Sequence, residues 1–310
     1  MLASIAYRIF RSVHYRASRL YRAATVSPDA GEDPAIPGIL LNTLPKSGSV
    51  FLFHTLSRSL RCGRMHVGNM YSLVDQISPE KMRRFVGGGY ISQNHLAPSP
   101  ENVQILEHFR CPVVLHVRDP RQALVSWAHH ADSVYRREGE EALLLFPQRP
   151  PAAYFSWDLT QKLDWQIDHY WPLLIDWLEH WLDVHDAARF PVLLTTYGEL
   201  CGDIVGLCRR ICDFCGVAAD RFQFVDIPKT DEYHYRLADD GEWLRVLSAG
   251  QIDRVNRTLP PGIAWRLGFP HPTAAAITAA PFDPRPPAAS CPSAIAPINN
   301  RYFEHRSDAP

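Results

Sequence analysis

The chain has 310 residues, of which 46% are hydrophobic and 21% are charged, and its formal net charge is −1. This length and composition are ordinary for one large globular α/β domain. The balanced charge excludes a global field that would draw the chain to nucleic acid. We therefore expect no nucleic-acid partner and only a local anion-binding region.

The first 37 residues are predicted to form a basic amphipathic segment followed by a linker. Five arginines precede the first acidic residue, Asp29, and apolar residues recur there near helical spacing. The pattern does not resemble a signal peptide. Two interpretations stay open: a helix lying on an anionic membrane surface, and a helix docked on its own domain or a frayed end.

A strand, a loop and a helix are predicted at the start of the main domain, which we expect to cover residues 38–269. Residues 38–44 form a short apolar run, Pro45-Lys-Ser-Gly-Ser49 interrupts it, and residues 50–60 place leucines on one helical stripe. A glycine-containing turn at this point directs backbone N–H groups and the helix dipole at one spot, which suits phosphate. The loop differs from a Walker A loop, because its lysine precedes the glycine.

A second unit of the same kind follows. Residues 113–117 are typical of a buried strand, Asp119 is a good helix N-cap, and residues 121–130 are predicted to be helical. Arg118 leaves the carboxyl end of the strand, where open α/β sheets bind ligands. Ser126 lies about two helical turns after the cap, so both side chains are placed to hold one phosphate. The alternative is a surface arginine and a buried helical serine.

Residues 192–196 are predicted to be a third strand, and residues 203–215 to be a helix after it. Residues 161–185 are predicted to be one long helix, with Trp171 and Trp181 on the side that packs in the core. Strands that alternate with helices predict an α/β protein, a three-layer P-loop-type fold with a central parallel β-sheet flanked by helices. Residues 270–310, rich in proline and alanine, are expected to be an extension of this domain.

The seven cysteines do not form the pattern of a disulfide framework. Cys208, Cys212 and Cys215 share one face of a predicted helix, and we favour core packing for them over zinc binding. The sequence predicts no metal site. This cysteine usage favours a reducing compartment, so we expect a cytoplasmic protein, at the membrane surface if the basic segment binds lipid.

Five segments, in the same order, resemble motifs of the sulfotransferases that use 3′-phosphoadenosine-5′-phosphosulfate (PAPS). The segments are Pro45-Lys-Ser-Gly-Ser-Val-Phe-Leu52, His95-Leu-Ala-Pro98, Val114-Leu-His-Val-Arg-Asp-Pro-Arg-Gln-Ala-Leu-Val-Ser126, Thr196-Tyr-Gly-Glu-Leu200 and Arg236-Leu-Ala-Asp-Asp-Gly-Glu-Trp243. Together they span about residues 38–268. The resemblance implies an enzyme that moves a sulfonate group from PAPS, its co-substrate, to an acceptor hydroxyl or amine on a small molecule, lipid or glycan.

The resemblance also implies a role for each matching residue. The donor-binding residues would be Lys46, Ser47, Gly48, Ser49 and Val50 at the 5′-phosphosulfate, Phe51 and Tyr197 at the adenine, and Arg118, Ser126 and Arg236 at the 3′-phosphate. The catalytic residues would be His95, as the general base, and Lys46, which would stabilise the leaving oxygen. His66 and Glu107 are weaker candidates for the base.

The sequence departs from the family pattern at several positions. Val50 replaces a usual threonine, Gln93 stands where cytosolic members often carry a lysine, and Leu237-Ala238 replaces a Lys-Gly pair. Two alternatives therefore stay open. One is another P-loop transferase, such as a small-molecule kinase. The other is a catalytically silent nucleotide-binding homologue.

Overall fold

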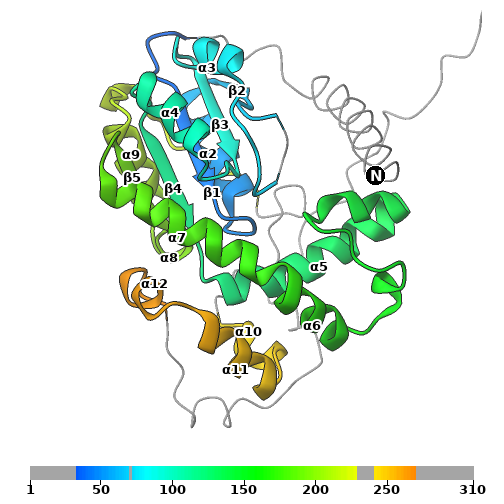
Figure 1. The fold of residues 1–310 in the computed structure, drawn as a ribbon. Coiled ribbons are helices and arrows are strands. Elements are labelled where there is room, and N and C mark those ends of the chain that lie inside the picture. Colours follow the sequence, from blue (N-terminus) through cyan, green and yellow to red (C-terminus); the bar gives the residue numbers. More distant parts are fainter. Residues whose placement is uncertain (1–32, 70–71, 229–240, 270–310) are drawn as a thin grey trace, which may run out of the picture.

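A five-stranded sheet, all parallel, forms the centre of the protein, which we describe from a computed structural model (Figure 1). The structure describes residues 33–69, 72–228 and 241–269. Across the sheet the strands are β2 (Gly63–Met65), β3 (Tyr90–Asn94), β1 (Ile39–Thr43), β4 (Val113–Val117) and β5 (Val192–Thr196). Asn42 of β1 lies opposite Asn94 of β3 and Leu115 of β4, so the carboxyl ends of these strands meet at one edge.

Eleven α-helices surround the sheet in the part of the chain that the structure describes. They are α2 (Ser49–Leu60), α3 (Pro79–Phe85), α4 (Pro100–His108), α5 (Pro120–Glu138), α6 (Leu159–His169), α7 (Trp171–Ala187), α8 (Tyr197–Gly202), α9 (Ile204–Phe214), α10 (Trp243–Val246), α11 (Ala249–Thr258) and α12 (Pro261–Arg266). Short 3₁₀ turns cover Gly139–Leu145, Tyr154–Ser156 and Ala219–Arg221. Several helices begin at a Ser or Asp whose side chain accepts a backbone N–H, as Asp119 does for α5.

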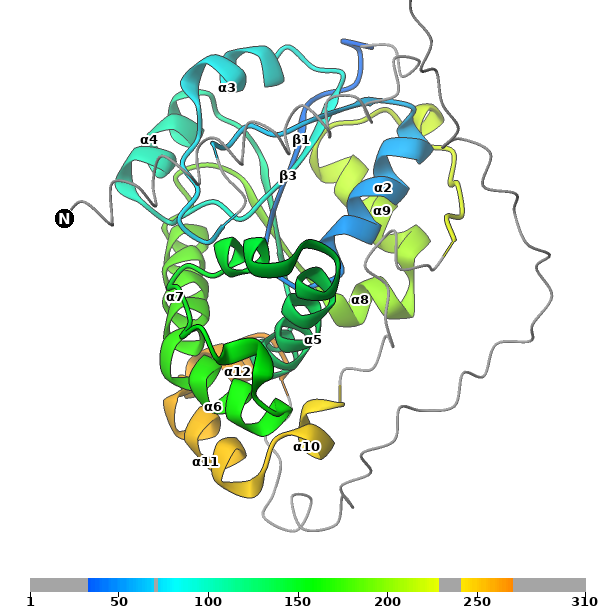
Figure 2. The same cartoon turned by 90° about the vertical axis from the view of Figure 1, so that its right-hand side faces the viewer.

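Alternate residues of the buried strands face two separate hydrophobic clusters. Leu40 and Leu115 pack with α4 and α7 on one face, whereas Ile39 and Leu41 pack with α2 and α9 on the other. Figure 2 shows the two pairs of helices on opposite sides of the sheet. Because successive side chains of a strand point to opposite faces, near-continuous apolar strands are the expected result of covering both faces. The three-layer α/β fold predicted from the sequence is confirmed.

The predicted long helix over residues 161–185 is wrong in one respect, because the structure divides it into α6 and α7 at Tyr170. Pro172 explains the break: it has no N–H to donate, and its ring clashes with the carbonyl group four residues earlier. The prediction for Trp171 and Trp181 is confirmed, since both side chains are at most 2% exposed.

Two strands, β2 and β3, are absent from the sequence prediction. β2 has three residues, and β3 carries the polar residues Ser92, Gln93 and Asn94, so neither shows the apolar run or strict alternation by which strands are recognised. The polar side chains are used in hydrogen bonds around the candidate site.

Cys208, Cys212 and Cys215 are buried in the hydrophobic cluster that includes α9, which confirms their predicted core packing.

The basic segment up to residue 32 and the tail from residue 270 lie outside the described residues, so their predicted character stays a prediction. Within the described part of the chain, no helix combines the length and the apolar composition needed to cross a membrane.

Candidate functional site

The loop between β1 and α2 has the backbone geometry of an anion-binding turn. Lys46 and Gly48 both have positive φ angles, of 66° and 77°, and the first helical residue is Ser49. Gly48 occupies the N-cap position, and no side chain there accepts a hydrogen bond from the first turn of α2. The N-terminal N–H groups of this twelve-residue helix therefore lack a capping side chain, and they lie beside the lysine of the loop.

Gly48 is required at its position for steric as well as conformational reasons. A Cβ atom on this residue would lie 2.8 Å from Cδ2 of Leu200 and 2.9 Å from Cε2 of Tyr197. The loop thus rests directly on the start of α8. Tyr197 is held there by a capping box, in which Thr196 Oγ1 accepts the N–H of Glu199 and the Glu199 carboxylate accepts the N–H of Thr196.

Arg118 connects the ends of β4, β5 and the loop. Its Nη1 donates to the carbonyl oxygen of Lys46 at 3.2 Å, and its guanidinium lies 3.8 Å from the centre of the Tyr197 ring. The side chain is buried, so its charge is poorly screened. The structure therefore brings together three residues that the sequence analysis assigned to the donor: Lys46, Arg118 and Tyr197.

His116 is a residue of this site that the sequence analysis missed. Its Nε2 donates to the carbonyl oxygen of Ser47 at 2.9 Å, and its Nδ1 accepts from the hydroxyl of Thr195 at 2.9 Å. The ring is completely buried, and desolvation lowers its pKa to about 4. It braces the loop against β4 and β5 as a neutral imidazole. The signal in the sequence was a histidine inside an otherwise apolar strand.

His95 directly follows the carboxyl end of β3, across from the end of β1. Its Nδ1 lies 2.6 Å from the carbonyl oxygen of Thr43, which can only accept, so Nδ1 carries the ring proton. Nε2 then holds the free electron pair that a general base needs. The Nε2 atom of Gln93 lies 3.4 Å from it and also donates to Thr43 Oγ1 at 3.1 Å.

The electrostatic surroundings keep His95 neutral. Burial lowers its pKa to about 4; the hydrogen bond to Thr43 opposes this shift, and the nearby cation of Lys46 adds to it. Lys46 therefore lies close enough to His95 for its charge to act on the ring. Glu107, one of the two weaker candidates for the base, lies on α4 at the surface, where it pairs with Arg189.

The other described residues that were assigned to the donor lie in the loop, in α2 and in α5. Ser47 and Ser49 are buried in the loop, and Val50 is half-buried in the first turn of α2. Phe51 packs in the same hydrophobic cluster as Tyr197. Ser126 is half-buried in the second turn of α5, and Arg236 lies outside the described residues. Among the described residues, no three His, Cys, Asp or Glu side chains gather as metal ligands.

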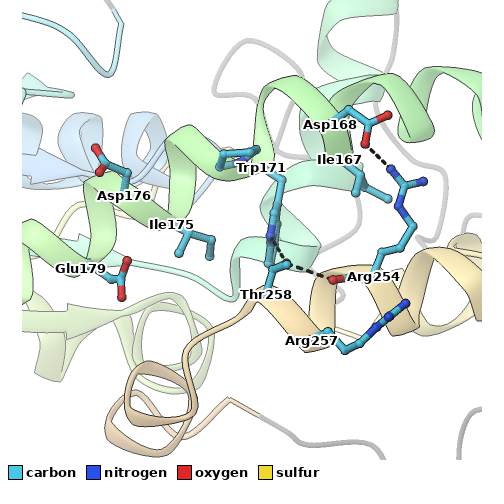
Figure 3. Close-up of a pocket in the computed structure, with 10 residues that line it drawn as sticks. Ile167, Asp168, Trp171, Ile175, Asp176, Glu179, Arg254, Arg257 and Thr258 are labelled. Atoms are coloured by element: carbon cyan, nitrogen blue, oxygen red, sulfur yellow. Dashed lines mark hydrogen bonds and ion pairs between the residues drawn. The ribbon is translucent and has the colours of Figure 1, made fainter.

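A pocket of about 630 Å³ lies between α6, α7 and α11, and none of the site residues lines it (Figure 3). Its polar groups bond to one another. Trp171 Nε1 donates to Thr258 Oγ1 at 2.9 Å, and Arg254 pairs with Asp164 and Asp168. This pocket is separate from the residues that converge at the ends of the strands.

The family model of the sulfotransferase domain matches residues 37–232 of the chain. Two solved structures are similar. The mouse sulfotransferase SULT7A1 in complex with PAP is 16% identical with a TM-score of 0.48, and the match covers 77% of this chain and 90% of that one. A sulfotransferase from Alicyclobacillus acidocaldarius is 15% identical with a TM-score of 0.40, covering 74% of this chain and 98% of that one. No curated protein matches the chain in sequence.

Proposed function

This chain belongs to the sulfotransferase domain family, and we propose that it transfers a sulfonate group from PAPS to an acceptor hydroxyl or amine. The observation that carries the proposal is the convergence at one edge of the sheet. The loop with Lys46 follows β1, His95 follows β3 and Arg118 follows β4. An anion-binding loop, a buried arginine and a histidine with a free Nε2 are the groups that such a transfer requires.

The donor loop fits a phosphosulfate group. The hydroxyl of Ser47 is buried without a hydrogen-bond partner, and the first turn of α2 has no capping side chain. Anionic oxygens would satisfy both kinds of donor. PAPS would supply the activated sulfonate and a bisphosphate leaving group. Lys46 would stabilise the negative charge that develops on the leaving oxygen.

His95 would accept the proton of the acceptor through Nε2 as the new bond to sulfur forms. The protein without ligands holds this residue as the free base at neutral pH, since its pKa is lowered to about 4. The negative charge of a bound donor would raise that pKa again, because a nearby anion favours the imidazolium form. His95 would then be both unprotonated before transfer and able to hold the proton afterwards.

We assign Arg118, together with Ser126 and Arg236, to the 3′-phosphate, and Phe51 and Tyr197 to the adenine. The stacking of Arg118 on Tyr197 supports this assignment, since it fixes a cation beside an aromatic ring at the strand ends. The acceptor would be a small molecule, lipid or glycan. We further propose a cytoplasmic location, with the basic N-terminal segment in contact with the membrane surface where the acceptor is a lipid.

The test is transfer from ³⁵S-labelled PAPS by the full chain, with cell extracts as acceptor and no added metal. Labelled products that require active protein would support the proposal. Calorimetry adds a second measurement: adenosine 3′,5′-bisphosphate should bind much more tightly than AMP. Arg118→Met should remove roughly 1.5–3 kcal/mol of that preference. Bisphosphate binding without any transfer would indicate a silent homologue, and turnover of ATP with magnesium would indicate a kinase.

A further inference from the structure

A buried arginine joins the first turn of α5 to the C-terminal helices. Arg121 is completely buried and lies three residues after Arg118 in the chain. Its guanidinium donates to both carboxylate oxygens of Asp119, from Nε to Oδ1 at 2.9 Å and from Nη2 to Oδ2 at 2.7 Å. Its Nη1 donates to Oδ1 of Asn256 on α11 at 2.8 Å. Its Cζ lies 4.1 Å from the centre of the Trp243 ring on α10. The transfer described above gives Arg121 no role.

Gln122, the next residue, forms a second connection to α10. Its Oε1 accepts the backbone N–H of Trp243 at 3.0 Å, and its Nε2 donates to Oε2 of Glu242 at 2.8 Å. Gln122 and Trp243 are completely buried, and Glu242 is buried as well. Because a buried polar group is costly to leave unpaired, these bonds fix the start of α5 against α10, which lies beside it (Figure 1).

The turn between β4 and α5 directs two neighbouring side chains to different partners. Arg118 donates to the carbonyl oxygen of Lys46 and stacks on Tyr197, at the donor loop. Asp119 caps α5 by accepting the backbone N–H of Arg121, and its carboxylate also binds the guanidinium of that residue. Two charge-assisted bonds to a planar guanidinium fix the position of a carboxylate well. Arg121 therefore holds the backbone directly after Arg118.

Arg121 also determines which cation the Asp119 carboxylate faces. The carboxylate is 2% exposed, so its ionised form depends on donors and cations of the protein rather than on water. Removing Arg121 would take a fork of charge-assisted bonds from this buried group, which favours any rearrangement that brings another cation to it. Arg118 is the adjacent residue. Without Arg121, the Asp119 carboxylate would compete with an anionic ligand for the guanidinium of Arg118.

We propose that Arg121 is a positioning residue for donor binding. By holding Asp119 against α10 and α11, it directs the guanidinium of Arg118 to the donor loop, where that guanidinium binds the 3′-phosphate. The inference rests on the proposed assignment of Arg118 to this phosphate. Arg121 acts through Arg118 and does not itself contact the nucleotide.

The test is calorimetry on the full chain with adenosine 3′,5′-bisphosphate and with AMP, which lacks the 3′-phosphate. The ratio of the two dissociation constants isolates the contribution of that phosphate. Arg121→Met should reduce the preference for the bisphosphate on the order of tenfold and leave the affinity for AMP nearly unchanged. Arg121→Lys retains the charge without the planar fork, so it should reduce the preference by a smaller factor.

Two controls separate this role from a general loss of stability. Lys162 is also a buried cation, and it pairs with Asp132 farther along α5. Lys162→Met should therefore lower the melting temperature and keep the wild-type preference for the bisphosphate. The second control is a double-mutant cycle. In an Arg118→Met background, Arg121→Met should cause no further loss of the preference, because Arg121 acts through Arg118.

A wild-type preference in a folded Arg121→Met protein would overturn the inference, and so would an equal loss in Lys162→Met or additive losses in the cycle. If Arg121→Met does not fold, Arg121→Lys decides the point, and a wild-type preference in that variant again overturns the inference. Equal affinity of the wild type for the bisphosphate and AMP is a distinct result. It would overturn the assignment of Arg118 to the 3′-phosphate, and the inference with it.

Discussion

Gly48 allows the geometry of the donor loop to be tested with a single methyl group. In Gly48→Ala the residue must keep a φ of about 77°, which destabilises an L-residue by roughly 1–2 kcal/mol. The new Cβ must also displace Leu200 and Tyr197, which it would approach to 2.8 and 2.9 Å, and such overpacking adds roughly 1–3 kcal/mol. Urea denaturation should therefore show a loss of roughly 2–5 kcal/mol in unfolding free energy.

Gly216 offers a control that isolates the steric part. Its φ is +76°, nearly the same as that of Gly48, but no atom lies within 4 Å of the position that a Cβ would take. Gly216→Ala should lose only the backbone contribution, roughly 1–2 kcal/mol. The difference between the two variants then measures the contact of the loop with α8.

The same displacement should weaken donor binding, because Tyr197 carries the stacked guanidinium of Arg118. We expect the affinity of Gly48→Ala for adenosine 3′,5′-bisphosphate to fall at least about tenfold, equivalent to about 1.4 kcal/mol, and that of Gly216→Ala to stay at the wild-type value. Calorimetry on both variants checks this. Equal losses of stability in the two variants, with bisphosphate affinity retained in Gly48→Ala, would refute the placement of the loop against Tyr197.

Three further predictions concern individual side chains. Lys46→Ala should lower kcat far more than bisphosphate affinity; an unchanged kcat with a raised donor KM would make Lys46 a ground-state binding residue. His95→Ala should nearly abolish transfer with an unchanged melting temperature, whereas retained activity would place the base elsewhere. Because the fold lowers the pKa of His116 from 6.5 to about 4, the unfolded chain binds the proton first. The free energy of unfolding should therefore be highest above pH 6.5 and fall by up to about 3 kcal/mol towards pH 4. Urea unfolding at several pH values should show a smaller fall in His116→Gln. An identical fall in this variant would contradict the prediction.

The parts of the fold that follow apolar periodicity could be predicted from the sequence. β1, β4 and β5 each begin with three consecutive apolar residues, and the cap at Asp119 marks the start of α5. β3 could not be recognised, because Ser92 and Asn94 bond to other polar groups beside the site rather than packing in the core. The break at Tyr170 was visible as Pro172, but the helical spacing of the tryptophans on both sides masked it.

The candidate site likewise contains residues that could be predicted from the sequence and residues that could not. Lys46, Gly48 and Arg118 lie in motifs that can be read from consecutive residues, and the structure brings them together. His116 and Thr195 could not be found in that way, because His116 bonds to Ser47 and to Thr195, which are 69 and 79 residues away from it in the chain. Their roles depend on which strands are neighbours in the sheet.

Gln93 departs from the family pattern but keeps a contact with the candidate base. The resemblance to cytosolic sulfotransferases leads one to expect a lysine there, two residues before the base, but a glutamine carries no charge. In this chain Nε2 of Gln93 donates to Thr43 Oγ1 at 3.1 Å and lies 3.4 Å from Nε2 of His95. The contact that this residue makes beside His95 is therefore that of a neutral amide, held in place by the end of β1, rather than that of a cation.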